Sequence, residues 1–63
     1  MEMRKGDFQI LLGRLEIGEN IVHALKSMGY WILDVSEYLY WREGEIMKAQ
    51  KRYIKSLGRK NID

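Results

Sequence analysis

Residues 29–45, GYWILDVSEYLYWREGE, decide the expected fold because they contain a helix stop followed by a helix start. Gly29 is suited to the left-handed conformation that ends many helices. Asp34, with Glu37 three residues later, is typical of a capped helix start, which places the second helix here or up to one turn earlier. The stretch therefore predicts a short link, residues 29–34, between two helices.

The sequence before the link has the 3.6-residue period of an amphipathic helix. One apolar stripe consists of Phe8, Leu11, Leu15, Gly18, Val22 and Leu25. A second stripe beside it consists of Ile10, Ile17, Ile21, Ala24 and Met28. We predict one continuous helix over residues 8–28, with Asp7 capping its first turn and Gly18 allowing close approach of a neighbouring helix.

Helical periodicity resumes after the link. The stripe facing the first helix is expected to consist of Val35, Leu39, Arg42, Ile46, Ala49 and Tyr53, and Leu57 closes it before Gly58. Steps of seven residues give a second apolar stripe of Tyr40, Met47 and Ile54. Gly44 should cost this helix about 1 kcal/mol relative to alanine. We predict a helix over residues 35–57, followed by a basic tail, residues 58–63.

Chain length limits how much apolar surface a single copy can bury. The 63 residues make one domain, and a domain of this size buries only about 60% of its unfolded surface. No cysteine is present to add a disulfide. Each predicted helix carries two stripes, whereas one neighbouring helix covers only one. We therefore predict an all-α fold: an antiparallel helical hairpin that dimerises with a second copy into a four-helix bundle.

Two arginines, Arg14 and Arg42, lie on or beside the apolar stripes. In one interpretation their methylene stems cover apolar surface while each guanidinium reaches solvent or a glutamate. In the other, they form an ion pair that fixes the register of the dimer.

No residue pattern predicts catalysis, a bound cofactor or a metal site. The single histidine, His23, is expected on the solvent face, and Asn20 stands where the Glu-x-x-His pattern of di-iron bundles requires glutamate. The glycines do not form a phosphate-binding loop. No apolar run approaches the roughly 18 residues of a membrane span. We expect a protein of the cytoplasm that is not an enzyme.

Charge is unevenly distributed although the net charge is only +2. Residues 46–63 carry six cations against one carboxylate, and residues 16–45 carry six carboxylates against two cations. An exposed basic stripe is expected from Lys48, Lys51, Arg52, Lys55 and Arg59. The stripe is either a solvated face or a surface for an acidic protein, a nucleic acid or, less in keeping with a bundle, anionic lipid.

Trp41 fits neither apolar stripe of the second predicted helix. It projects on the solvent side, in line with the basic stripe, where an indole has no core to fill. Tryptophan and arginine are enriched at binding hot spots. Trp41 is therefore, with the basic stripe, a candidate for binding a partner.

The segment MGYWILDVSEYLYWREGEIMKAQKRYIK, residues 28–55, resembles small helical proteins encoded by the spindle-shaped viruses (fuselloviruses) of the archaeon Sulfolobus, and the resemblance extends over the whole chain. It implies a helical-hairpin protomer and a dimer that forms an antiparallel four-helix bundle. It also implies a non-enzymatic adaptor that joins other macromolecules in the cytoplasm of the host cell. It brings no catalytic or binding residues to this sequence.

Two functions follow from these features. The first is a homodimeric interaction module, an adaptor whose other partner is a protein. The alternative is a small DNA-binding regulator that uses the basic stripe for phosphate contacts.

Overall fold

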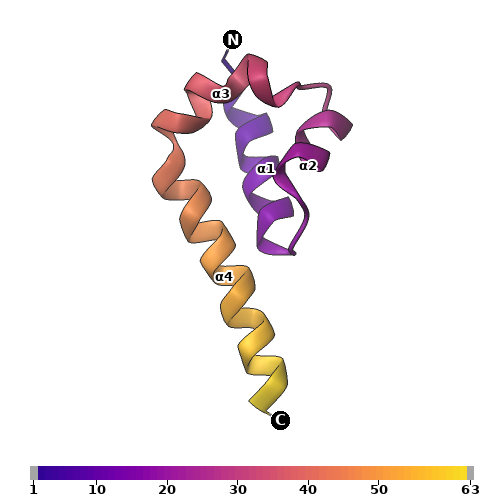
Figure 1. Ribbon diagram of the computed structural model, residues 1–63, viewed down its shortest axis with the longest axis vertical. Coiled ribbons are helices and arrows are strands. Elements are labelled where there is room, and N and C mark those ends of the chain that lie inside the picture. Colours follow the sequence, from indigo (N-terminus) through magenta and orange to yellow (C-terminus); the bar gives the residue numbers. More distant parts are fainter. Residues whose placement is uncertain (1, 63) are drawn as a thin grey trace.

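The computed structural model describes residues 2–62, with side chains for residues 2–58, and this part of the chain forms four helices and no strand (Figure 1). The helices are α1 (Lys5–Glu16), α2 (Ile21–Ser27), α3 (Ile32–Trp41) and α4 (Glu43–Ile62). The predicted all-α class is confirmed. The predicted helix bounds are corrected at the start of α1, at Gly18, in the link, at Arg42 and at the end of α4.

The helix expected over residues 8–28 is interrupted after Glu16. Gly18 has a φ of 88°, and its amide donates to the Leu15 carbonyl at 3.0 Å. The Glu19 amide donates to the Arg14 carbonyl, also at 3.0 Å. This pair of bonds around a left-handed glycine is a Schellman motif, which satisfies the last carbonyls of α1. Gly18 is thus a helix stop, and its lack of a side chain also allows the predicted close approach of a neighbouring helix, here through Tyr53 of α4.

Asn20 starts the next helix immediately. Its side-chain oxygen accepts hydrogen bonds from the amides of Val22 at 2.9 Å and His23 at 3.2 Å. Asparagine is among the preferred N-cap residues because it satisfies amides that lack partners within the helix. The stop at Gly18 and the cap at Asn20 divide the predicted helix into α1 and α2.

Gly29 ends α2 as predicted, with a φ of 89°. The Tyr30 amide donates to the Leu25 carbonyl at 2.8 Å, so this end is a second Schellman motif. The link is shorter than residues 29–34, because Trp31 occupies the N-cap position and α3 begins at Ile32. Asp34 consequently lies in the first turn of α3 instead of capping it.

The helix expected over residues 35–57 is divided at Arg42, where φ is −107° and ψ is 14°. Helix α4 then continues to Ile62, past the predicted end at residue 57. Most of the predicted basic tail, residues 58–63, therefore has helical backbone.

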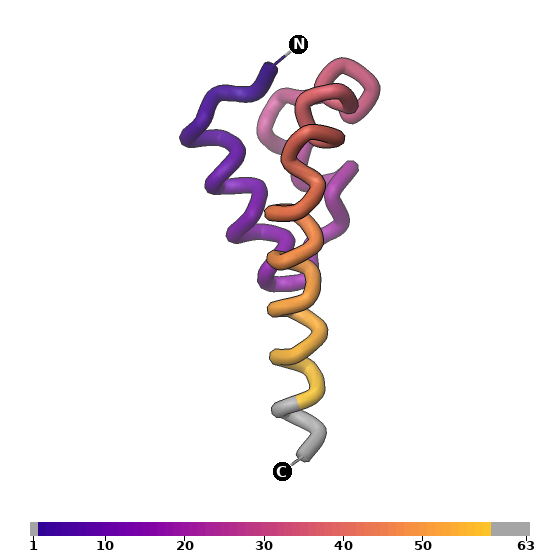
Figure 2. The backbone as a smooth tube through the Cα atoms, turned by 90° about the vertical axis from the view of Figure 1, so that its left-hand side faces the viewer, coloured from indigo at the N-terminus to yellow at the C-terminus, as the bar shows by residue number. Residues whose placement is uncertain are grey.

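The antiparallel hairpin is corrected as well, because α1 and α4 run side by side in the same direction (Figures 1 and 2). The Arg42 guanidinium lies 5.8 Å from the centre of the Phe8 ring, and further down both helices Arg52 lies 2.6 Å from Glu16. A hairpin would have paired the start of one helix with the end of the other. The turn at Gly18 reverses the chain early, so α2 is the antiparallel neighbour of α1, and α3 crosses the top to reach α4.

The core lies where the four helices meet. Its buried apolar residues are Met3, Phe8, Leu11, Leu15, Ala24, Leu25, Val35, Leu39, Ile46 and Ala49. Helix α4 extends well beyond the ends of α1 and α2 (Figure 2). The radius of gyration is accordingly 12.5 Å, against about 10.6 Å for a compact chain of this length.

Candidate interaction surface

The residues predicted as core or dimer contacts fall into three groups. Those buried within the single chain are Phe8, Leu11, Leu15, Leu25, Val35, Leu39 and Ile46. Those half-buried are Ile21, Val22 and Tyr53. Those exposed are Ile17, Tyr40, Met47 and Ile54, with exposed fractions of 76%, 67%, 48% and 64%. The third group has no cover within the described chain, and its burial in a dimer stays a prediction.

An open apolar groove lies between α2, α3 and α4. Its apolar lining consists of Ile21, Ile32, Leu39, Tyr40, Ile46 and Met47. Ser36 and Glu43 are its polar members. Ile32 is the residue that the sequence reasoning missed, because it was assigned to the link. Its seven-residue spacing from Leu39 would have placed it on the same side of a helix that began earlier.

The groove continues into an exposed strip along α4, which we call the apolar strip: Tyr40, Met47, Ile54 and Leu57. Tyr40 and Met47 both line the groove, so they lie on the same side of the molecule although the helix is divided between them. Ile54 and Leu57 follow at steps of seven and three residues and are 64% and 41% exposed. The apolar strip therefore extends from α3 to the part of α4 that projects beyond the core.

Two contacts fix the middle of α4 against the end of α1. A Cβ atom added to Gly18 would lie 2.4 Å from Cε1 of Tyr53, so the ring packs directly on the glycine. Arg52 forms an ion pair of 2.6 Å with Glu16. Through these two contacts α4 packs against the turn that follows α1.

Arg42 lies at the division between α3 and α4. Its guanidinium packs over the rings of Phe8 and Tyr38, 5.8 and 5.5 Å from their centres, and is 3.4 Å from Glu45. The two rings contact each other edge to face at 5.6 Å. This arrangement is the first of the two interpretations weighed for Arg42, in which the side chain covers apolar surface and reaches a glutamate.

Arg14 follows the same interpretation. Its guanidinium donates to the Ser27 hydroxyl and lies 3.6 Å from Glu19. It therefore links the end of α1 to α2 within one chain.

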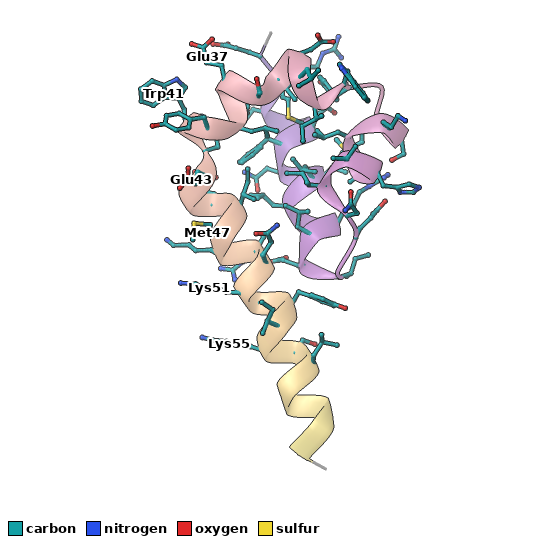
Figure 3. All side chains as sticks on the ribbon, in the orientation of Figure 1. Glu37, Trp41, Glu43, Met47, Lys51 and Lys55 are labelled. Atoms are coloured by element: carbon teal, nitrogen blue, oxygen red, sulfur yellow. The ribbon has the colours of Figure 1, made fainter. Side chains whose placement is uncertain are left out.

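The predicted basic stripe is only partly a free face. Lys48, Lys51 and Lys55 are exposed, and the last two project from the left edge of α4 together with Glu43 and Met47 (Figure 3). Arg52 is turned toward α1, where it pairs with Glu16. The side chain of Arg59 lies outside the described residues.

Trp41 is 75% exposed, as the sequence predicted. Its ring lies edge to face with Tyr40, with centres 5.5 Å apart. The same indole lines a second, more polar groove with Glu2, Glu37 and the Arg42 and Tyr38 side chains. Its role in binding a partner stays a prediction.

One tyrosine has a shifted pKa. The Tyr30 hydroxyl donates to Asp7 at 2.5 Å and so joins the link to the first turn of α1. The hydrogen bond to the carboxylate, followed by partial burial, raises the pKa of Tyr30 above its usual 10.0. The bond fixes the position of the link against α1.

Within the described part of the chain, no three His, Cys, Asp or Glu side chains come together as metal ligands would. The His23 side chain is 77% exposed and its Nδ1 atom lies 3.3 Å from Glu19. No described helix combines the length and apolar character needed to cross a membrane. Comparisons of the chain with protein-family models, curated proteins and solved structures found no match.

Proposed function

We propose that this chain is a non-enzymatic homodimeric interaction module, an adaptor that binds other macromolecules. The observation that carries the proposal is the amount of surface one copy leaves exposed, which is 4947 Å². A compact monomer of 7.5 kDa exposes about 4,250 Å². The excess of about 700 Å² accompanies the elongated shape of the molecule, in which the apolar residues Ile54 and Leu57 of α4 are exposed.

The composition of the excess surface supports association. The apolar strip and the groove beside it form one continuous apolar region, and contiguous regions of this kind mark interaction sites on soluble proteins. The dimer is then a bundle of two four-helix protomers and not of two hairpins. Burial of the strip supplies the stability that a chain of 63 residues lacks alone.

The adaptor role rests on a second exposed site, the Trp41 indole, which is 75% exposed at the bend between α3 and α4 and is not part of the apolar strip. Large exposed aromatics are typical anchors of protein interfaces. In keeping with the resemblance to fuselloviral proteins, we place the dimer in the cytoplasm of an archaeal host cell.

The adaptor proposal is tested by affinity capture from host extract with wild-type protein and Trp41→Ala. Trp31→Ala is the matched control, because Trp31 is also exposed, at 45%, but packs under Lys26 at the other end of α3. Host proteins retained by the wild type and Trp31→Ala but lost with Trp41→Ala would support the adaptor. Identical capture by all three variants would contradict the role of Trp41.

The alternative is a DNA-binding regulator, which the exposed lysines 48, 51 and 55 on one side of α4 favour. Three phosphate contacts in each copy would make binding to duplex DNA fall steeply as salt increases. Titration of labelled duplex at low salt separates the proposals. Binding that is lost when all three lysines are replaced by glutamine would support the regulator, and no binding at low salt would eliminate it.

A further inference from the structure

We propose that two copies pair through antiparallel α4 helices around a two-fold axis near Met47, so that the projecting end of each α4 lies in the apolar groove of the other copy. The inference rests on the proposed dimer and names its surface and its geometry. One copy has an open apolar groove and a helix end with exposed apolar residues, and in a dimer the helix end of one copy would fill the groove of the other.

The first feature is the groove between α2, α3 and α4, which is apolar and open. No segment of the described chain occupies it, although Leu39 and Ile46 beneath it are buried. The second feature is the lower part of α4, which projects beyond the ends of α1 and α2 (Figure 2). Ile54 and Leu57, in the second half of this helix, are exposed. A groove that lacks a helix and a helix that lacks neighbours lie on the same chain.

The spacing of residues along α4 suits a two-fold axis at Met47. In an antiparallel pair centred there, a residue that precedes Met47 faces the residue that follows it by the same number of positions. Ile54 lies seven positions after Met47, and Tyr40, seven positions before it, stands on α3 across the bend at Arg42 but lines the groove together with Met47. Ile54 of each copy would therefore meet Tyr40 of the other, at the mouth of the groove, and the two Met47 side chains would meet at the axis.

Charge selects the antiparallel orientation. Glu43 and Lys51 each lie four positions from Met47 and project from the same edge of α4 (Figure 3). In the antiparallel pair, each Glu43 faces a Lys51. In a parallel pair, carboxylate would face carboxylate and ammonium would face ammonium, which is unfavourable on both counts. Exposed pairs of this kind add little affinity, so they act mainly on orientation.

The shape of the molecule also suits this pairing. The molecule measures 43 Å along its longest axis and only 22 and 19 Å across. Two such elongated copies placed head to tail would each cover the projecting helix of the other.

Cysteine cross-linking tests the geometry directly, because the natural chain has no cysteine and each variant carries a single thiol. After mild oxidation, the Met47→Cys variant should form a disulfide that joins the two identical chains of the dimer across the axis. Tyr40→Cys and Ile54→Cys should each remain mostly reduced alone, but should form a disulfide-linked heterodimer when mixed. Disulfides require Cα atoms within about 7 Å, so cysteines held together at the proposed contact should cross-link faster than cysteines that meet only by random collision.

His23→Cys is the matched control. His23 is 77% exposed and lies two residues after Ile21, so it points away from the groove. Cross-linking of this variant at the rate of Met47→Cys would show that collisions explain the result and would overturn the pairing. Wild-type protein that sediments as a dimer while none of the strip variants cross-links would overturn the pairing but leave the dimer. Wild-type protein that sediments as a monomer would overturn both.

Charge reversal provides an independent measurement. Glu43→Lys and Lys51→Glu should each weaken dimerisation by about tenfold at low salt, because each places two like-charged pairs at the interface. The double variant should recover wild-type affinity. A parallel dimer would instead keep like charges opposed in all four proteins, so equal affinity of the wild type and the three variants would contradict the antiparallel arrangement, as would a double variant that stays as weak as the single ones.

Discussion

Replacing Gly18 by alanine should destabilise the protein more than any other glycine substitution in the described chain. Gly18 has a φ of 88°, a conformation that costs an L-residue roughly 1–2 kcal/mol. The new methyl group would also lie 2.4 Å from the Tyr53 ring. The colliding atoms are the tip of a half-buried ring, so displacing them adds about 0.5–1.5 kcal/mol, the cost of turning a side chain away from its rotamer. We expect a total of about 1.5–3.5 kcal/mol, against roughly 3–9 kcal/mol of stability typical of a domain this size.

Gly29→Ala is the matched control, because Gly29 has a φ of 89° but no atom within 4 Å of the added Cβ. It should cost only the backbone term, about 1–2 kcal/mol. Urea unfolding followed by circular dichroism, at one fixed protein concentration, gives the free energy of unfolding for both variants.

The difference between the two glycine variants isolates the contact of α4 with the turn after α1. Replacing Tyr53 by alanine in the Gly18→Ala background should remove the collision, so the two substitutions should couple favourably in a double-mutant cycle. Equal destabilisation by Gly18→Ala and Gly29→Ala would contradict the contact, since it would mean that Tyr53 does not pack on Gly18.

Three further predictions concern the core, the ion pair and the link. Leu25→Ala should reduce the free energy of unfolding by about 2–5 kcal/mol, because Leu25 is completely buried, and thermal unfolding will show this directly. Arg52→Ala should cost about 0.2–1 kcal/mol at low salt and less at high salt, because its ion pair with Glu16 is exposed; a cost independent of salt would contradict the electrostatic account. The pKa of Tyr30 is raised in the fold, so the hydrogen bond of its neutral hydroxyl contributes fully to the free energy of unfolding below pH 10.0, and this contribution is lost as the pH rises through the raised pKa. Tyr30→Phe should therefore lose less stability than the wild type at alkaline pH, which a pH series of urea unfolding curves measures. An alkaline loss equal to that of the wild type would contradict this role of Tyr30.

Helical periodicity predicted the helical class and most of the residues that face the core, because it depends only on local spacing. Phe8, Leu11 and Leu15 lie on one side of α1 and are buried, although the helix that was expected to carry them was longer. The same periodicity concealed the break, since apolar residues continue at Ile17 and Ile21 on either side of it.

The missed turn had local signals. Gly18 followed by Asn20 is a helix stop followed by a helix start, and both residues act in that way. Once the chain reverses there, α1 and α4 become parallel neighbours, and the antiparallel hairpin no longer applies. A single turn thus decided the topology.

The division at Arg42 had no comparable signal. No glycine or proline stands at that position, and Gly44 remains inside α4. The bend accompanies a tertiary contact of the Arg42 guanidinium with Phe8, which is distant in the sequence, beside a local contact with Tyr38 one helical turn earlier. Contacts of this kind cannot be derived from helical propensity. The groove and its missed residue Ile32 depend on the same bend.

Sedimentation equilibrium of the wild-type protein over a range of micromolar concentrations tests the central proposal most directly. Because the apolar strip is exposed in one copy, we predict a mass of twice the 7.5 kDa chain, with dissociation only on dilution. A folded species of 7.5 kDa at every concentration would contradict the proposal, since one copy would then be stable with its apolar strip in water.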